Sequence, residues 1–274
     1  MSGAADFDYE GSLWGAETVR PGEWTIAGFR LEEALVHLPR TGALLEVGCG
    51  AGRFLRALQL SRPQLVLTGV DVSRAALQRL AQLAPDLSTR VVEGAALPAT
   101  DGEFDAVLAL DVLEHVSDPD AMLAEIWRVL APGGVVHLHV PCEADPLCLW
   151  RWLPGQSGPR ALKRRFGGHV QRFRRRELLA RIEASGFETL RVRHSLHLLG
   201  NLADVALFAG MALARRLRPG AAAATSGDVV ARGAERASVA GWVVRAVDTV
   251  LWCEAQLLGR MPSWSLHVSA RKLA

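Results

Sequence analysis

The chain has 274 residues, 50% of them hydrophobic, and a formal net charge of +2 at pH 7. This length suits one α/β domain with an appendage, and the small net charge gives no sign of a polyanion-binding protein. The four cysteines have no C-x-x-C or metal-ligand spacing, so we expect free thiols, no metal and a cytoplasmic location. Residues 1–8 carry neither a basic region nor an apolar core, so we expect no signal peptide.

The first 40 residues precede the first strongly apolar strand. Residues 26–38 have the apolar spacing of an amphipathic helix, which Pro39 ends. Two aromatic residues, Tyr9 and Trp14, lie before this helix among glycines. Two interpretations fit them equally: a cover over a ligand, or a seal on the edge of a sheet.

The most informative stretch is a glycine-rich turn near residue 50. An apolar run ends at Glu46, three glycines follow at alternate positions (Gly48, Gly50 and Gly52), and a helical pattern begins directly after them. This predicts a strand, a tight turn and a helix N-terminus, the arrangement by which an α/β sheet holds a nucleoside-containing cofactor. The G-x-G-x-G spacing differs from the G-x-G-x-x-G of dinucleotide-binding enzymes.

Polar residues and turns end the strands that follow. Residues 65–71 are an apolar strand ending at Asp71, whose carboxylate can accept hydrogen bonds from both hydroxyls of a ribose. Residues 90–98 predict a short strand and a turn, and residues 104–116 predict a buried strand that becomes polar at Asp111. A helix ending in Pro-Gly-Gly then leads into a fifth strand. This alternation predicts a parallel sheet with right-handed crossovers.

The order of these motifs resembles the class I S-adenosylmethionine (SAM)-dependent methyltransferases of the small "type 11" kind. The resemblance covers roughly residues 40–195 and rests on Glu46–Gly52, Val70–Ser73, Leu97–Pro98 with Phe104–Asp105, Val112–His115 and Leu130–Gly134. It implies a doubly wound, seven-stranded, mostly parallel sheet of the Rossmann-like type with its last strand antiparallel. It also implies SAM as the cofactor and S-adenosylhomocysteine as the product.

The resemblance also implies a role for each motif residue. The three glycines would line the methionine end of SAM, and Glu46 would hold their loop through hydrogen bonds. Asp71 would bind the ribose hydroxyls, and Val72 would pack on the adenine. The remaining cofactor residues are Ala95 and Ala96 at the adenine edge, and Leu110 and Asp111 beside the methionine moiety. The family often has Asp where this chain has Ala95, which leaves adenine recognition there to the backbone or to water.

The segment after the fifth strand supplies candidate substrate contacts. Residues 143–159 are rich in Pro, Trp and Gly and predict a loop in which Trp150 forms an apolar wall. Seven of the fourteen residues 163–176 are basic, Arg172 among them. This segment is either a solvated face or a counter-charge for a phosphate, a carboxylate or anionic lipid headgroups. Aromatic residues are sparse in it, so we do not favour nucleic acid as a partner.

A long insertion separates the last two predicted strands, residues 189–195 and 265–272. It contains two apolar stretches, residues 196–217 and 239–258, joined by an Ala/Gly/Ser-rich linker over residues 218–238. Each stretch approaches a membrane span in length. The second carries an Arg, an Asp and a Glu, and each Asp or Arg costs about 2.5–3.5 kcal/mol at a bilayer centre. We therefore expect a helical hairpin that packs on the core, on a second subunit in a homodimer, or on a membrane surface.

Three residues are candidates for chemistry. Methyl transfer requires alignment of the acceptor atom with the methyl group, and a hydroxyl acceptor benefits from a base near pKa 7. His169, in the glycine-flanked basic segment, is a candidate base or substrate ligand. His115 follows Asp111 by one helical turn, although the family mostly places this position against the cofactor. Glu143, just past the fifth strand, is the third candidate, and an amine or activated-carbon acceptor needs no base.

The sequence thus predicts four segments: a helical lid over residues 1–40, a SAM-binding core over 41–195, an apolar cap over 196–264 and a final core strand over 265–274. We expect methyl transfer to a small or lipid-like acceptor with an apolar body and an anionic group, O-methylation being slightly favoured, and peripheral membrane contact. Two alternatives stay open. One is a nucleic-acid or protein methyltransferase, although the chain lacks the Asn/Asp-Pro-Pro-aromatic element of base-amino methylators. The other is a non-catalytic SAM-binding protein that uses the hairpin as an interaction surface.

Overall fold

The computed structural model describes residues 8, 10, 15–153, 159–217 and 239–273. In this part of the chain, seven strands form a sheet with the order β3-β2-β1-β4-β5-β7-β6. β7 runs antiparallel to β5 and β6, and the other neighbouring pairs are parallel. The strands are β1 (Gly42–Val47), β2 (Leu65–Asp71), β3 (Ser88–Val91), β4 (Phe104–Leu110), β5 (Leu130–Pro141), β6 (Phe187–Ser195) and β7 (Ser265–Lys272). The predicted doubly wound sheet with an antiparallel last strand is confirmed.

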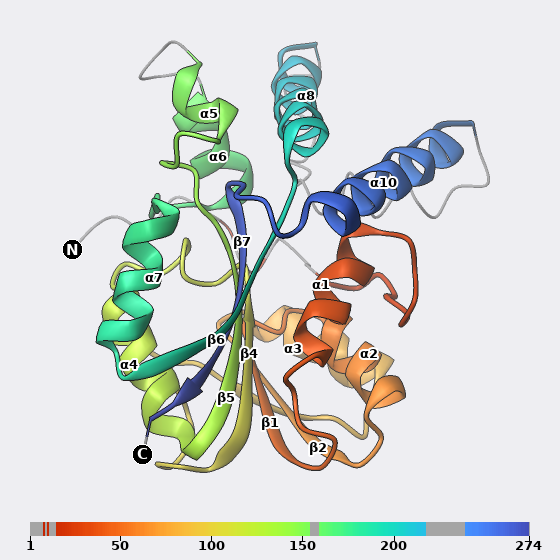
Figure 1. Cartoon of the computed structure of the whole chain (residues 1–274). Helices are drawn as coiled ribbons and strands as arrows, with labels where there is room; N and C mark the ends of the chain where they lie inside the picture. Colours follow the sequence, from red (N-terminus) through yellow and green to blue (C-terminus); the bar gives the residue numbers. More distant parts are fainter. Residues whose placement is uncertain (1–7, 9, 11–14, 154–158, 218–238, 274) are drawn as a thin grey trace.

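Helices cover both faces of this sheet (Figure 1). The helices on one face are α1 (Ile26–Leu35), α2 (Arg53–Ser61) and α3 (Arg74–Leu83), and those on the other are α4 (Pro119–Val129) and α7 (Arg175–Ala184). The central strands β1 and β4 are mostly apolar because both of their faces are covered. Leu44 and Leu108 pack toward α1 and α2, whereas Leu45 and Val107 pack toward α4 and α7.

Side chains at the helix N-termini fix where two of these helices begin. The Ser73 hydroxyl accepts a hydrogen bond from the Ala76 amide at the start of α3. The Asp118 carboxylate accepts hydrogen bonds from the amides of Asp120 and Ala121 at the start of α4, where Pro119 occupies the first turn. Such caps satisfy backbone donors that have no partner within the helix. The first of these helices begins three residues after the carboxyl end of β2, and the second follows the turn after β4, so both begin at the edge where the candidate site lies.

The predicted helical insertion is present between β6 and β7. It consists of α8 (Leu198–Leu217) and α10 (Val239–Leu258), which extend beyond the carboxyl edge of the sheet (Figure 1). α10 packs on α1, where the Asp248 carboxylate accepts a hydrogen bond from the Ile26 amide at 2.9 Å. The rings of Trp24 and Trp252 also stack there, 5.6 Å apart. The predicted linker, residues 218–238, lies outside the described residues.

One charged residue of the insertion, Glu254, is buried because it forms hydrogen bonds within the insertion. The Glu254 carboxylate on α10 accepts hydrogen bonds from the amides of Leu199 at 2.7 Å and Gly200 at 3.1 Å, so it caps the start of α8. α8 in turn packs on α5 (Leu149–Trp152) and α6 (Pro159–Gly167). No helix in the described part of the chain is both long enough and apolar enough to cross a membrane.

Three buried histidines of the neighbouring strands β5 and β7 lie on the sheet face that α1 covers. His137 contacts the Ser269 hydroxyl at 2.9 Å, and His139 contacts the Ser265 hydroxyl at 2.8 Å. The third, His267, packs edge-on against the ring of Phe29 in α1. Burial lowers the pKa of all three imidazoles, that of His137 to about 3. These histidines are therefore neutral in the folded protein at neutral pH.

Neutral buried histidines make the fold sensitive to acid. Below about pH 6.5 the unfolded chain binds protons that the folded chain cannot, so stability falls as the pH decreases, by up to about 1.4 kcal/mol per pH unit for each histidine. We expect the urea midpoint to fall steadily between about pH 6.5 and 5. His137→Gln should reduce the change of unfolding free energy per pH unit by the contribution of one histidine, up to about 1.4 kcal/mol. An unchanged slope in this variant would show that His137 does not titrate on unfolding as proposed.

Candidate active site

The glycine turn between β1 and α2 has the backbone shape that a close ligand approach requires. Gly48, Gly50 and Gly52 have φ angles of 71°, 52° and 82°, which side-chain-bearing residues rarely adopt. A Cβ at Gly48 would lie only 2.8 Å from Cγ2 of Val112, so the turn after β4 packs against the glycine turn. The Gly48 amide donates to the Val70 carbonyl at 2.8 Å, which ties the turn to the end of β2.

Asp71 lies at the carboxyl end of β2, beside the glycine turn. One carboxylate oxygen accepts a hydrogen bond from the Gly50 amide at 2.8 Å, and the other accepts one from the Ser73 amide at 2.9 Å. Burial raises the pKa of Asp71, and the hydrogen bonds from these amides oppose that rise. Each carboxylate oxygen has a further lone pair that can accept a ribose hydroxyl.

The N-terminal segment reaches the same edge of the sheet. The Glu10 carboxylate accepts hydrogen bonds from the amides of Arg74 and Ala75, both at 2.9 Å, at the start of α3. Arg56 of α2 donates to the carbonyls of Ala16 and Glu17 at 2.8 and 2.7 Å. These contacts hold the described part of the segment across α2 and α3, close to Asp71. Tyr9 and Trp14, the candidate substrate residues there, lie outside the described residues.

Glu46 is buried beneath the glycine turn. Its Oε2 atom has no hydrogen-bond partner among the described residues. Burial raises the pKa of Glu46 well above its ordinary value, although the Leu55 amide in the first turn of α2 opposes the rise. The contact with Leu55 places this carboxyl between the end of β1 and the start of α2, on either side of the turn.

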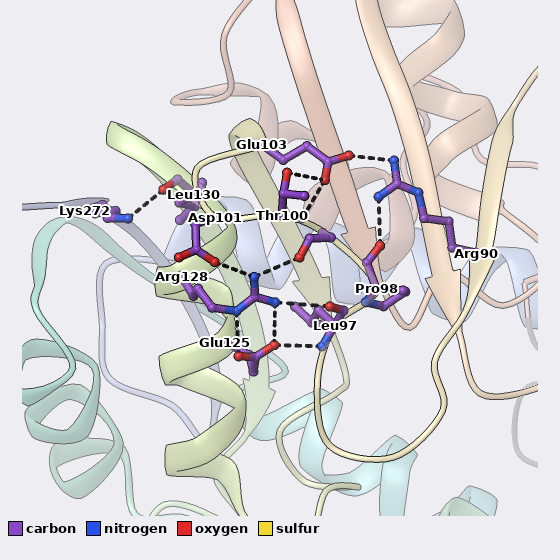
Figure 2. Close-up of polar contacts among 11 residues, drawn as sticks. Arg90, Leu97, Pro98, Thr100, Asp101, Glu103, Glu125, Arg128, Leu130 and Lys272 are labelled. Atoms are coloured by element: carbon purple, nitrogen blue, oxygen red, sulfur yellow. Dashed lines mark hydrogen bonds and ion pairs between the residues drawn. The ribbon is translucent and has the colours of Figure 1, made fainter.

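A polar network anchors the turn after β3, where the adenine edge is predicted to bind (Figure 2). The guanidinium of Arg128 in α4 donates to the carbonyls of Leu97 at 3.1 Å and Ala99 at 2.8 Å. The Glu125 carboxylate accepts a hydrogen bond from the Leu97 amide at 2.8 Å. Ala95 and Ala96 precede this anchored segment and are exposed, as is Val72, 52% of whose surface is accessible. At Ala95 and Ala96 the turn thus presents backbone groups and small side chains rather than a carboxylate.

Asp111 follows β4 in a left-handed conformation, with a φ angle of 55°. One carboxylate oxygen accepts a hydrogen bond from Arg30 of α1 at 2.5 Å, and the other lies 2.7 Å from Nδ1 of His139. Burial alone would raise the pKa of Asp111, but the charge of Arg30 and the hydrogen bond with His139 hold it well below its ordinary value. Asp111 is therefore an anchored carboxylate at the end of β4, and Leu110 just before it is buried.

A second group of ionisable residues surrounds Glu143, just past β5. Its Oε1 lies 2.8 Å from Nδ1 of His169 and 3.5 Å from Nζ of Lys163, and Arg172 donates to the Glu143 carbonyl at 2.9 Å. Burial would raise the pKa of Glu143, but His169 and Lys163 lower it to about 2. The His115 ring packs edge-on against the His169 ring, 5.0 Å away between centroids. The three predicted catalytic candidates thus lie together in the structure.

Lys163 joins this group to the insertion. Its ammonium lies 2.7 Å from the Asp204 carboxylate of α8 and over the rings of Phe208 at 4.3 Å and Trp264 at 5.3 Å. Trp150 donates its indole N–H to Asp204 and is 5% exposed. The structure therefore places Trp150 in the packing between the insertion and the core, while Trp152 is exposed.

Sequence reasoning did not single out several residues of this site. Arg30 lies in a helix that was predicted only as amphipathic, and its partner Asp111 is 81 residues away in the chain. In the sequence Lys163 is one of seven basic residues in its segment, whereas the structure buries it. In the sequence Glu114 is part of the Val112–His115 motif. The one feature of the sequence that could have singled out Glu114 is its position directly before the candidate histidine His115.

Comparison with known proteins identifies the family. A model of the methyltransferase domain family matches residues 26–192. The chain is 40% identical over 120 residues to demethylmenaquinone methyltransferase of Deinococcus radiodurans, covering 42% of this chain and 49% of the relative. It is 33% identical over 122 residues to ubiquinone biosynthesis O-methyltransferase of Caulobacter vibrioides, covering 39% and 48%. The chain therefore spans about half the length of these curated relatives.

A solved structure resembles the fold over most of the chain. A putative sarcosine dimethylglycine methyltransferase from Galdieria sulphuraria has a TM-score of 0.57 at 17% identity and covers 89% of this chain and 84% of its own. The sheet order and the glycine turn define an α/β protein of the class I methyltransferase type. With more than half of the chain matched by the family model, the protein belongs to the methyltransferase domain family.

Proposed function

We propose that the protein transfers the methyl group of SAM to the hydroxyl of a small or lipid-like acceptor. The observation that carries this proposal is the meeting of two groups at one edge of the sheet. Gly48 and Asp71 form a nucleoside-cofactor cradle, and the His169–Glu143 pair provides an acid–base group. The residues after β4 link them, because Val112 packs against Gly48 and the Glu114 carbonyl accepts hydrogen bonds from the amides of Val170 and Gln171.

The residues of the cradle fit SAM. The glycine turn and the buried Glu46 would hold the methionine end, with Leu110 and Asp111 closing the site beside it. Asp71 would accept the ribose hydroxyls, Val72 would pack on the adenine, and the backbone at Ala95 and Ala96 would meet the adenine edge. SAM supplies an electrophilic methyl group when bound, so the protein has mainly to align the acceptor and take up its proton.

His169 is the proposed base for a hydroxyl acceptor. Glu143 orients its imidazole through Nδ1 at 2.8 Å, so Nε2 is available to accept the acceptor's proton. The charge of Glu143 stabilises the imidazolium that then forms. Arg172, which is half-buried beside Glu143, is the proposed contact for an anionic group on the acceptor. An amine acceptor would leave this base unused.

The exposed surface of the insertion supports a lipid-like acceptor and contact with an anionic membrane surface. At helical spacing, each helix exposes an apolar stripe on the side away from the core: Leu198, Leu199, Leu202, Leu213 and Leu217 on α8, and Trp242, Val243, Val247, Val250 and Leu257 on α10. The exposed Arg216 and Arg260 flank these stripes with positive charge. The names of two relatives, a demethylmenaquinone methyltransferase and a ubiquinone biosynthesis O-methyltransferase, agree with such an acceptor.

Transfer of labelled methyl from SAM to phenols, catechols and prenylated quinols, with and without anionic vesicles, tests the proposal. We expect His169→Ala to lower turnover by about 100-fold or more while SAM affinity is unchanged. SAM binding without transfer to any acceptor class would favour the non-catalytic alternative. Salt-sensitive retention of RNA, with transfer to it, would favour the nucleic-acid alternative.

Vesicle flotation and sedimentation equilibrium test the insertion separately. Replacing Trp242 and Leu257 with Ser should abolish flotation with anionic vesicles and leave the sedimentation mass unchanged. If flotation is absent in the unmodified protein and a dimer mass is lost in the variant, the stripes form a subunit interface and the membrane proposal is wrong.

A further inference from the structure

Three potential metal ligands lie together beside the proposed acceptor position. Glu114 and His115 come from the turn between β4 and α4, and His169 comes from the segment between α6 and α7. One ligand atom of each residue lies within 4.8 Å of the other two. The Glu114 carbonyl accepts hydrogen bonds from the amides of Val170 and Gln171, both at 2.9 Å, so the backbone holds the two segments together.

Glu114 is the unusual member of this group. Its side chain is fully buried, and neither carboxyl oxygen has a hydrogen-bond partner among the described residues. The nearest imidazole nitrogen is Nε2 of His115, 3.9 Å from Oε1. A buried carboxyl without a partner is costly, and a bound cation would remove that cost.

The two histidines are oriented as metal-binding histidines are. Nδ1 of His115 lies 3.2 Å from the Gly168 carbonyl oxygen, and Nδ1 of His169 lies 2.8 Å from Oε1 of Glu143. Because both partners are acceptors, each Nδ1 carries the proton and each Nε2 carries the lone pair of the ring. A metal-bound histidine characteristically donates its other ring N–H to a carbonyl or a carboxylate in this way.

We propose that Glu114, His115 and His169 bind a divalent transition-metal ion, with Zn²⁺ as the best match. Two imidazoles and one carboxylate are the donor set of several catalytic zinc sites, which keep a fourth position open. The His115 and His169 side chains are 21% and 13% exposed, so the open position faces solvent rather than the core. The ligand atoms must approach one another by roughly 1 Å to reach tetrahedral spacing, which side-chain rotation can supply.

The catalytic part of this inference rests on the proposed function, whereas metal binding does not. A hydroxyl at the open position would have its pKa lowered by the cation, and its proton would pass to solvent water. The hydroxyl oxygen would then form a bond to the methyl carbon as the carbon–sulfur bond of SAM breaks, leaving a neutral thioether. In the metal-bound protein His169 is a ligand, and the cation replaces it in activating the acceptor.

Calorimetric titration of Zn²⁺ into chelator-treated protein tests the site. A Cys253→Ser background removes the thiol that the structure exposes. We expect one Zn²⁺ per chain, binding weakened about 100-fold or more by Glu114→Gln and by His169→Ala, and about 10–100-fold by Glu143→Gln. His37→Ala, which changes a histidine outside the cluster, should leave binding unchanged.

Thermal unfolding provides a control for folding. Without metal, Glu114→Gln should unfold at or above the temperature of the parent protein, because it replaces an unpartnered buried carboxyl. Zn²⁺ should raise the unfolding temperature of the parent protein but not that of this variant. Absence of binding, or binding that Glu114→Gln and His169→Ala leave unchanged, overturns the proposal.

The two proposals fail in different ways. If Zn²⁺ binds as expected and chelation leaves methyl transfer unchanged, the catalytic part of the inference is wrong. If no acceptor is methylated at all, the proposed function fails, and the calorimetric result still decides the metal site.

Discussion

Asp71→Ala is expected to weaken the binding of SAM and of S-adenosylhomocysteine about 100-fold or more. The variant removes the acceptor of two proposed ribose hydrogen bonds, and each such bond to a charged group is worth about 1.5–3 kcal/mol. It also removes the carboxylate that holds the amides of Gly50 and Ser73 in place. Calorimetric titration with both ligands measures the loss.

Two further variants make this experiment specific. Asp71→Asn keeps one acceptor oxygen and should bind with intermediate affinity. Asp86→Ala, which changes an exposed aspartate after α3, should bind as the parent protein does. Equal SAM affinity in Asp71→Ala and the parent protein would exclude Asp71 from the cofactor site, and circular dichroism would show whether each variant is folded.

The residues of the proposed cofactor site could be grouped from the sequence because their signals are local. Gly48, Gly50 and Gly52 stand at fixed spacing after an apolar strand, and Asp71 ends the next strand. Parallel strands bring their carboxyl ends to one edge of the sheet, so the order of motifs along the chain is enough to assemble them. The alternation of strands and helices predicts the parallel part of the sheet, whereas the antiparallel β7 was expected from the family resemblance.

The acceptor half was less predictable because its contacts join distant segments. His169 and Glu143 were separate candidates, and nothing in their spacing indicates that they form a pair 2.8 Å apart. Lys163 stands in a run of basic residues that is typical of a solvated face, yet its partner Asp204 lies 41 residues later on an inserted helix. Whether an ionisable side chain is buried depends on which element of the fold covers it. The residues next to it in the sequence do not indicate which element that is.

The insertion and the acid–base group are coupled through Lys163. Burial alone would lower the pKa of Lys163, but Asp204 and Glu143 raise it, so the ammonium stays charged. The same side chain lies among the rings of Trp150, Phe208 and Trp264. Any movement of α8 that displaces Asp204 therefore changes the charge balance around Glu143, which orients His169. The insertion is thus connected to the proposed base.

Lys163→Met is expected to destabilise the protein by about 3–5 kcal/mol, because removing one partner of a buried ion pair leaves the other charge uncompensated. Urea unfolding measures the change, with Arg165→Met, on an exposed position of the same helix, as the control that should shift stability by less than about 0.5 kcal/mol. Adding Asp204→Asn to Lys163→Met should recover part of the loss, since the second change removes the unpaired carboxylate.

A loss below about 1 kcal/mol in the single variant would mean that the Lys163–Asp204 pair is solvated rather than buried. Amide hydrogen exchange then separates local from global effects: faster exchange confined to α8 would place the role of Lys163 in holding the insertion on the core.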